Sequence, residues 1–129
     1  MARAKGAIEM RRLWIGLGAL AGLTATMMAA LSAHAFSGLD AHAHTMIASA
    51  IQMQGWHALA LFGTGLWAPQ GGRLADAAGC AFTAGLLLFC GAVYGIALYG
   101  APFGGAAPIG GSLFMLGWGL IAVSSVRAR

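Results

Sequence analysis

The chain has 129 residues, of which 60% are hydrophobic and only 8% are charged, and its mean hydropathy is +0.80. A soluble domain carries about 25% charged residues, so this composition leaves too few charges to cover a soluble surface. It excludes a separate soluble catalytic domain and predicts one membrane-embedded domain over residues 1–129.

Four apolar stretches follow one another along the chain, at about Leu13–Phe36, Met46–Trp67, Ala77–Tyr99 and Pro108–Val126. None of them contains Asp, Glu, Lys or Arg, and each approaches the roughly 20 apolar residues that a transmembrane helix needs. Because backbone groups in lipid must be satisfied within the protein, helix is the expected conformation. We predict an all-α membrane protein with four transmembrane helices.

The first stretch also resembles a signal peptide, because a basic start and an apolar run precede Ala33-His34-Ala35, a cleavage-like sequence. Its apolar run of about 24 residues is longer than the core of a typical signal peptide. We therefore expect this stretch to be retained as the first transmembrane helix.

Short segments rich in turn residues connect the stretches, at Ser37–Thr45, Ala68–Asp76 and Gly100–Ala107. Short connections make consecutive helices antiparallel, which predicts an up-down-up-down bundle. Pro108 is compatible with the first turn of the fourth helix, where its missing N–H costs nothing.

The basic residues predict the orientation of this bundle. Four crossings place all seven of them on one side, and the first and third connections contain none. The positive-inside rule then puts both termini in the cytoplasm, and we expect Trp14 and Trp67 at that interface. The basic ends are explained by topology and lipid headgroups, so the net charge of +4 does not indicate nucleic-acid binding. The seven residues are Arg3, Lys5, Arg11, Arg12, Arg73, Arg127 and Arg129.

Histidine in a membrane helix is costly and usually faces other helices. His34 ends a row of small residues at i, i+4 spacing that contains Gly18 and Gly22, a close-packing signature. We therefore expect His34 to point into the bundle.

A second group of polar residues lies on the later helices. Gln54 and His57 are three residues apart and share a helix face, whereas Gln52 should look elsewhere. Tyr94, near the close-packing pair Gly91 and Gly95, could complete a hydrogen-bonded cluster. This cluster is either structural, holding helices together, or a site for a ligand, proton or ion.

No cofactor is expected. His57 lies roughly 15 Å deeper in the membrane than His34, which argues against a bis-histidine haem site. A weak candidate for metal binding is the outer loop, where His42 and His44 lie near Asp40, His34 and Met46; solvated loop histidines are the alternative.

The two cysteines, Cys80 and Cys90, are too far apart along one helix to form a disulfide. We interpret both as buried free thiols. Neither a nucleotide-binding loop nor a nucleophile paired with a base is recognisable in the sequence, and the acidic residues Glu9, Asp40 and Asp76 are all peripheral. We expect no enzymatic activity.

Several motifs in order resemble the family catalogued as domain of unknown function 423, which includes the bacterial YgdD-like inner-membrane proteins and a eukaryotic transmembrane relative. They are AALSAH ending at His34, QMQGWHALAL from Gln52, GLLLFCGAVY ending at Tyr94, PIGG from Pro108, and the pair Gly117 and Trp118. The resemblance covers about Leu13 to Val126. The residues that match the family pattern are His34, Gln52, Gln54, His57, Phe89, Gly91, Tyr94, Pro108, Gly110, Gly111, Gly117 and Trp118.

The resemblance implies a bacterial inner-membrane protein of four helices and brings no established activity; Gly110, Gly111 and Gly117 become further candidates for helix packing. The chain departs from the family pattern at Ala29 and Ser32, where the family has glycines, and at Cys90, where it has a serine. These changes bear on the packing of the first helix and on any role of that serine.

Three functions remain open from the sequence. The preferred one is an accessory or scaffold protein whose lipid-facing glycines and alanines dock it on other membrane-protein subunits or on itself. The second is a small transporter or ion-conducting protein that uses Gln54 and His57. The third is metal binding by the outer loop. The lipid bilayer is an expected partner, and no small-molecule substrate is indicated.

Overall fold

The computed structural model describes residues 1–128, with backbone alone for residues 2–4, and is helical without strands over this range. Arg129 and the side chain of Arg3, both predicted on the cytoplasmic side, lie outside the described part of the chain. The elements are the helices α1 (Ala2–His34) and α2 (Ala41–Gly85), a π-helical segment η1 (Leu86–Cys90), α3 (Gly91–Tyr99) and α4 (Ala106–Arg127).

The helices extend beyond the apolar stretches. α1 includes the basic N-terminal segment, because Lys and Arg are good helix formers even where they cannot enter lipid. Three continuous helical segments are long and apolar enough to cross a membrane, namely Lys5–His34, Ala41–Tyr99 and Ala106–Arg127.

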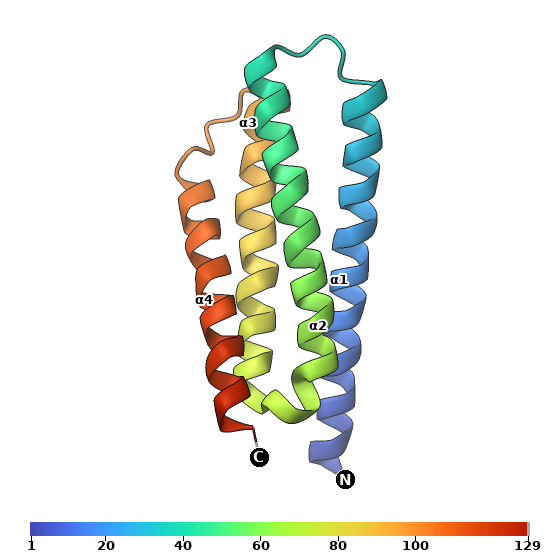
Figure 1. Cartoon of the computed structure of the whole chain (residues 1–129), viewed down its shortest axis with the longest axis vertical. Coiled ribbons are helices and arrows are strands. Elements are labelled where there is room, and N and C mark those ends of the chain that lie inside the picture. Colours follow the sequence, from blue (N-terminus) through green and yellow to red (C-terminus); the bar gives the residue numbers. More distant parts are fainter. Residues whose placement is uncertain (129) are drawn as a thin grey trace.

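The second predicted connection, Ala68–Asp76, contains the reversal of the chain, although most of it is helical. Helix continues on both sides of Gly72, and this one residue carries the reversal with φ 56° and ψ −141°. Glycine adopts such a φ without the steric penalty that a side chain would bring. The parts of α2 before and after Gly72 consequently run side by side in opposite directions (Figure 1).

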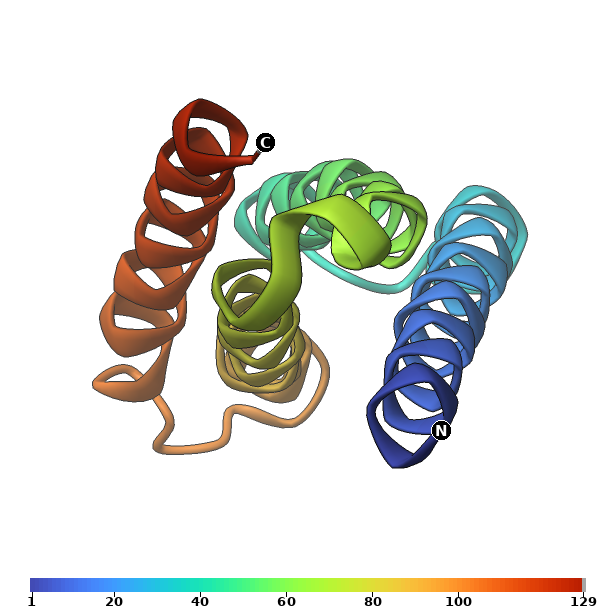
Figure 2. The same ribbon diagram turned by 90° about the horizontal axis from the view of Figure 1, so that it is seen from below.

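The first part of α2 lies in the middle of the molecule (Figure 2). α4 packs against α2 and η1, whereas the backbone of α1 approaches only that of α2 within the described chain. η1 and α3 continue the second part of α2 without a break. As a result, α1 and η1 face each other across an open side of the bundle.

The core gathers large side chains from every long helix. Trp14, Leu61, Phe82 and Phe114 are all at most 3% exposed and belong to one cluster. In a membrane such packing holds helices together through shape complementarity, since lipid is as apolar as the core. This cluster fixes α4 against both parts of α2.

Three of the predicted packing glycines lie at close helix contacts. A Cβ on Gly18 would come within 2.6 Å of the backbone nitrogen of Phe62, and one on Gly117 within 2.6 Å of the Phe82 ring. Gly110 lies directly against the backbone nitrogen of Phe89. A side chain at any of these positions would push the helices apart.

The other four predicted packing glycines have looser contacts or none. A Cβ on Gly22 would have ordinary contact with Ala58 at 3.9 Å, and one on Gly95 would meet Phe103 of the following loop at 3.0 Å. Gly91 and Gly111 are wrong as packing positions, because a Cβ there meets nothing within 4 Å. Three further glycines lie at close contacts that their spacing in the sequence did not predict, namely Gly65 against Ile15, Gly79 against Trp14 and Gly85 against Phe114.

Candidate functional site

A hydrogen-bonded network centred on Gln54 joins α1, α2 and α3. Gln54 Nε2 donates to the carbonyl oxygen of Ala21 at 3.0 Å and to Thr24 Oγ1 at 2.7 Å. Tyr94 donates from its hydroxyl to Gln54 Oε1 at 2.7 Å. The predicted pairing of Gln54 with Tyr94 is therefore confirmed, and Thr24 is a member that the sequence analysis missed.

The direction of every bond in this network follows from one carbonyl. The Ala21 oxygen can only accept, so the amide nitrogen of Gln54 must face it, and Oε1 must face Tyr94. The Thr24 hydroxyl donates to the carbonyls of Leu20 and Ala21. Every N–H and O–H proton of the Gln54, Thr24 and Tyr94 side chains therefore takes part in a hydrogen bond within the bundle.

His57 belongs to a different network, which joins α2 to α4. Its Nδ1 is 2.7 Å from the Met53 carbonyl oxygen, and the Trp118 indole Nε1 is 3.2 Å from its Nε2. A carbonyl only accepts and an indole only donates, so the ring is neutral with its proton on Nδ1. His57 also stacks on Phe114, with ring centroids 3.6 Å apart.

The structure splits the predicted cluster of His34, Gln54, His57 and Tyr94. Gln54 and His57 are both buried but bond to opposite neighbours, and Gln52 is exposed, as predicted. His34 does not point into the bundle: it is exposed at the last residue of α1, because α1 has a neighbour on one side only.

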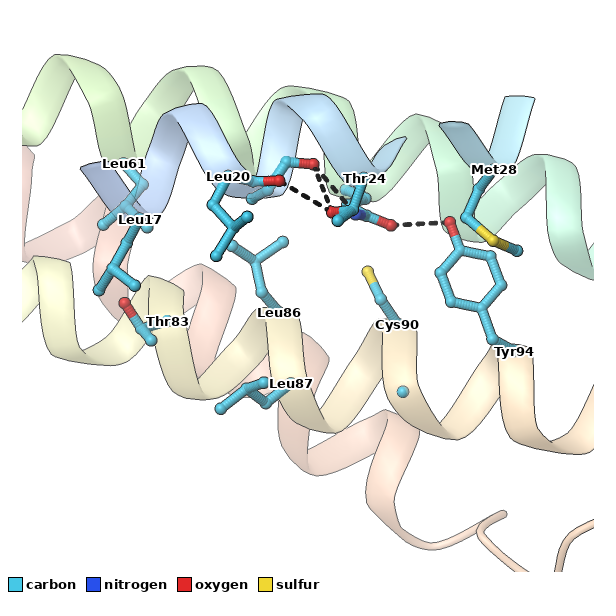
Figure 3. A pocket seen from close by; sticks show the side chains of 13 residues that line it. Leu17, Leu20, Thr24, Met28, Leu61, Thr83, Leu86, Leu87, Cys90 and Tyr94 are labelled. Carbon is cyan, nitrogen blue, oxygen red and sulfur yellow. Dashed lines mark hydrogen bonds between the residues drawn. The ribbon is translucent and has the colours of Figure 1, made fainter. Parts of the chain in front are cut away.

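A groove of about 400 Å³ lies between α1 and the η1–α3 segment (Figure 3). Leu17 and Leu86 lie at one end together with Thr83, and Thr24, Gln54 and Tyr94 lie at the other end together with Met28. Its volume falls in the range of ligand sites in proteins. The groove exists because η1 and α1 face each other without close contact.

Cys90 also lines this groove, in the π-helical turn, where helical geometry departs from the regular pattern. Such turns often occur at functional sites. Cys90 Sγ is 3.7 Å from the Ala50 carbonyl oxygen, a weak bond that a serine at this position could replace. Cys80, in contrast, is exposed, so its prediction as a buried thiol is wrong.

The two tryptophans predicted at the cytoplasmic interface, Trp14 and Trp67, make specific polar contacts. Trp14 is 3% exposed, and its indole donates to Asp76 Oδ1 at 2.9 Å. Trp67 donates to Ser124 Oγ at 2.9 Å. Both bonds tie helices near the Gly72 reversal, and Asp76 is thus a structural acceptor.

The proposed outer-loop histidines lie within the first turn of α2. Asp40 is the residue before this helix, and its Oδ1 accepts from the Ala43 backbone N–H at 2.8 Å, which caps the helix. His42 is exposed and His44 partly so, and residues two apart on a helix do not share a face. The described residues include no cluster of three or more His, Cys, Asp or Glu suited to a metal.

Comparison with known proteins places this architecture in a family. The family described as protein of unknown function (DUF423) matches residues 28–111. The UPF0382 membrane protein of Haemophilus influenzae is 30% identical, covering 93% of this chain and 98% of its own length. The UPF0382 membrane protein of Staphylococcus aureus and UPF0382 membrane protein YwdK of Bacillus subtilis are each 30% identical, over 90% of this chain and 97% and 98% of theirs.

No solved structure matches the chain. The family match and the relatives agree with the helical, apolar structure and include the Gln54, His57 and Tyr94 region. The chain belongs to the DUF423 family of membrane proteins of unknown function.

Proposed function

We propose that the protein is an accessory or scaffold component of the bacterial inner membrane. In this proposal it crosses the bilayer four times, keeps both termini in the cytoplasm and docks on other membrane-protein subunits or on a second copy. No catalytic step is part of its role.

The position of the basic residues supports four crossings. Both termini and the Gly72 reversal lie at the same end of the molecule (Figure 1). Lys5, Arg73 and Arg127 are exposed there. If each part of α2 crosses the membrane, these charges lie on one side, as the positive-inside rule requires.

The observation that carries the docking role is a depression of about 310 Å³ between α2 and α4. Trp56 and Trp118 line it and are 58% and 51% exposed. Tryptophan favours the membrane interface, yet both residues lie well inside their helices. Large aromatic side chains of this kind are common anchors of protein interfaces.

Gly63 lines the same depression, and a Cβ there would meet nothing within 4 Å. Glycine weakens a helix relative to alanine, and no contact inside the bundle requires it here. A small residue on an outer face lets a second helix approach closely. We therefore place the docking surface on this α2–α4 depression.

The interior of the bundle favours this role over transport. Among the side chains that the structure describes, every buried nitrogen and oxygen has a hydrogen-bond partner. Both ring nitrogens of His57 are engaged, and Gln54 is bonded on both sides. A solute or proton would have to break these bonds, each of which is costly to lose in an apolar surrounding.

Purification in a mild detergent tests the proposal. The wild-type protein is expected to retain stoichiometric partner subunits or a defined homo-oligomer, and Gly63→Leu is expected to lose them. Gly91→Leu is the matched control, because it also lies on a helix with an empty Cβ position but faces the groove on the other side. A clean wild-type monomer without partners contradicts the proposal.

A further inference from the structure

The groove between α1 and the η1–α3 segment has its interhelical polar network at one end and mainly leucines at the other, where the Thr83 hydroxyl donates to its own helix (Figure 3). Tyr94 lies at the polar end, five residues before α3 ends at Tyr99, or roughly 7 Å along the helix. From Met28 to Leu17 the groove follows α1 for roughly 16 Å. In the proposed topology of four crossings, the end with Tyr94 is close to the membrane surface and the groove runs from there toward the bilayer centre.

The polar end offers hydrogen-bond acceptors and no free donor. The Tyr94 hydroxyl proton points to Gln54, both amide protons of Gln54 point to α1, and the Thr24 proton points to backbone carbonyls. Lone pairs remain on the Tyr94, Gln54 and Thr24 oxygens. A molecule that binds here must therefore donate a hydrogen bond.

This requirement separates classes of lipid. A carboxylate, a phosphate diester or an ester carbonyl brings only acceptors, which would face the lone pairs of Tyr94 and Gln54. An ammonium could donate, but it would have to lose its charge or its water in an apolar groove without a counter-charge. A hydroxyl donates while remaining neutral.

We propose that the groove binds a long-chain alcohol, with its hydroxyl donating to the acceptors at Tyr94, Gln54 and Thr24. Its alkyl chain lies along Leu20 and Leu86 toward Leu17. The volume of about 400 Å³ accommodates one chain. The alcohol is therefore a single-chain lipid, because the two acyl chains of a diacylglycerol would not fit this volume. The proposal does not depend on the docking role.

Photo-crosslinking in vesicles of phosphatidylcholine, whose headgroup has no hydrogen-bond donor, tests the site. The full chain is reconstituted with dodecanol that carries a diazirine in mid-chain, and the crosslinked residues are mapped by mass spectrometry. Labelling is expected on the groove side chains Leu20, Leu86 and Leu87. Unlabelled dodecanol is expected to compete about fivefold better than dodecyl methyl ether, which cannot donate, because one hydrogen bond provides that ratio.

Two glycine variants give the matched control. Gly91→Leu adds a side chain to the groove lining at a position where a Cβ meets nothing within 4 Å, and it is expected to reduce groove labelling at least fivefold while the unfolding free energy stays close to that of the wild type. Gly63→Leu, on the other face, is expected to label like wild type. Labelling spread evenly over the lipid-facing surface, equal competition by the ether, or full labelling of Gly91→Leu overturns the proposal. A monomer without partners leaves it intact.

Discussion

Trp118 and His57, which are 61 residues apart, share a hydrogen bond of 3.2 Å from the indole Nε1 to the imidazole Nε2. The other ring nitrogen of His57 is 2.7 Å from the Met53 carbonyl. A proton added to Nε2 would face the indole N–H, so the bond requires the neutral ring. The intramembrane histidine thereby fixes α4 against α2, in the role of a structural side chain.

A double-mutant cycle measures this coupling. Trp118→Phe removes the indole N–H and is expected to lower the free energy of unfolding by about 1 kcal/mol. His57→Ala also leaves a cavity beside Phe114 and Phe82 and is expected to cost about 3 kcal/mol. Because the shared bond is lost only once, the double variant should fall short of the sum by about 1 kcal/mol. Unfolding by SDS from mild detergent gives the values; strict additivity contradicts the bond.

Tyr94→Phe is expected to lower the free energy of unfolding by about 1 to 2 kcal/mol, because it leaves Gln54 Oε1 without the donor it has in the bundle. The matched control is Tyr99→Phe, since Tyr99 is 84% exposed at the end of α3. Thermal unfolding in detergent should distinguish the two. Equal midpoints for both variants would show that the Gln54 network contributes nothing to stability.

Adjacent glycines on α4 are expected to respond in opposite directions. Gly110→Ala places a methyl group against the Phe89 backbone and should cost about 2 kcal/mol, the range for overpacking. Gly111→Ala meets nothing within 4 Å and should stabilise the helix by up to about 1 kcal/mol. The unfolding free energies of the two variants provide the test, and the same sign for both contradicts the packing described for η1 against α4.

Cysteine accessibility tests the four crossings. In a variant with Cys80→Ala and Cys90→Ala, a new cysteine at Gly38 or Gly104 is expected to react with an impermeant maleimide added outside intact cells. A cysteine at Arg73 should react only after the membrane is permeabilised, because the Gly72 reversal lies on the cytoplasmic side in the proposed topology. Reaction of the Arg73→Cys variant in intact cells would remove that topology.

Much of the fold class was predictable from local sequence properties. Apolar stretches without charged residues predict membrane helices because each residue contributes its own transfer free energy, and the helical class is confirmed. The glycine contacts were predicted less well. The i, i+4 spacing identified Gly18 correctly, yet Gly91 has an equally favourable spacing and a Cβ added there would meet nothing within 4 Å. Spacing shows that small residues share one face of a helix, but it does not show which neighbour lies against that face.

The polar site shows the same limit. The sequence placed Gln54 with Tyr94, because few polar residues occur in the apolar stretches and these must find partners in lipid. It also grouped His57 and His34 with them, since spacing along one helix does not show how that helix is rotated against its neighbours. Thr24 could have been predicted as a member of the network, because it is a hydroxyl residue within an apolar stretch and its hydroxyl needs a partner there.

By itself, the sequence determined that this chain is a helical membrane protein. It also determined that all of its basic residues except Arg73 lie near the two termini. Both properties follow from the hydropathy and charge of residues that are neighbours along the chain. The tertiary structure alone decided that Gly72 carries the reversal, that His57 bonds to Trp118, and that α1 stands apart from η1 to leave a groove. Each of these depends on the rotation and separation of helices, which long-range packing sets and no local pattern records.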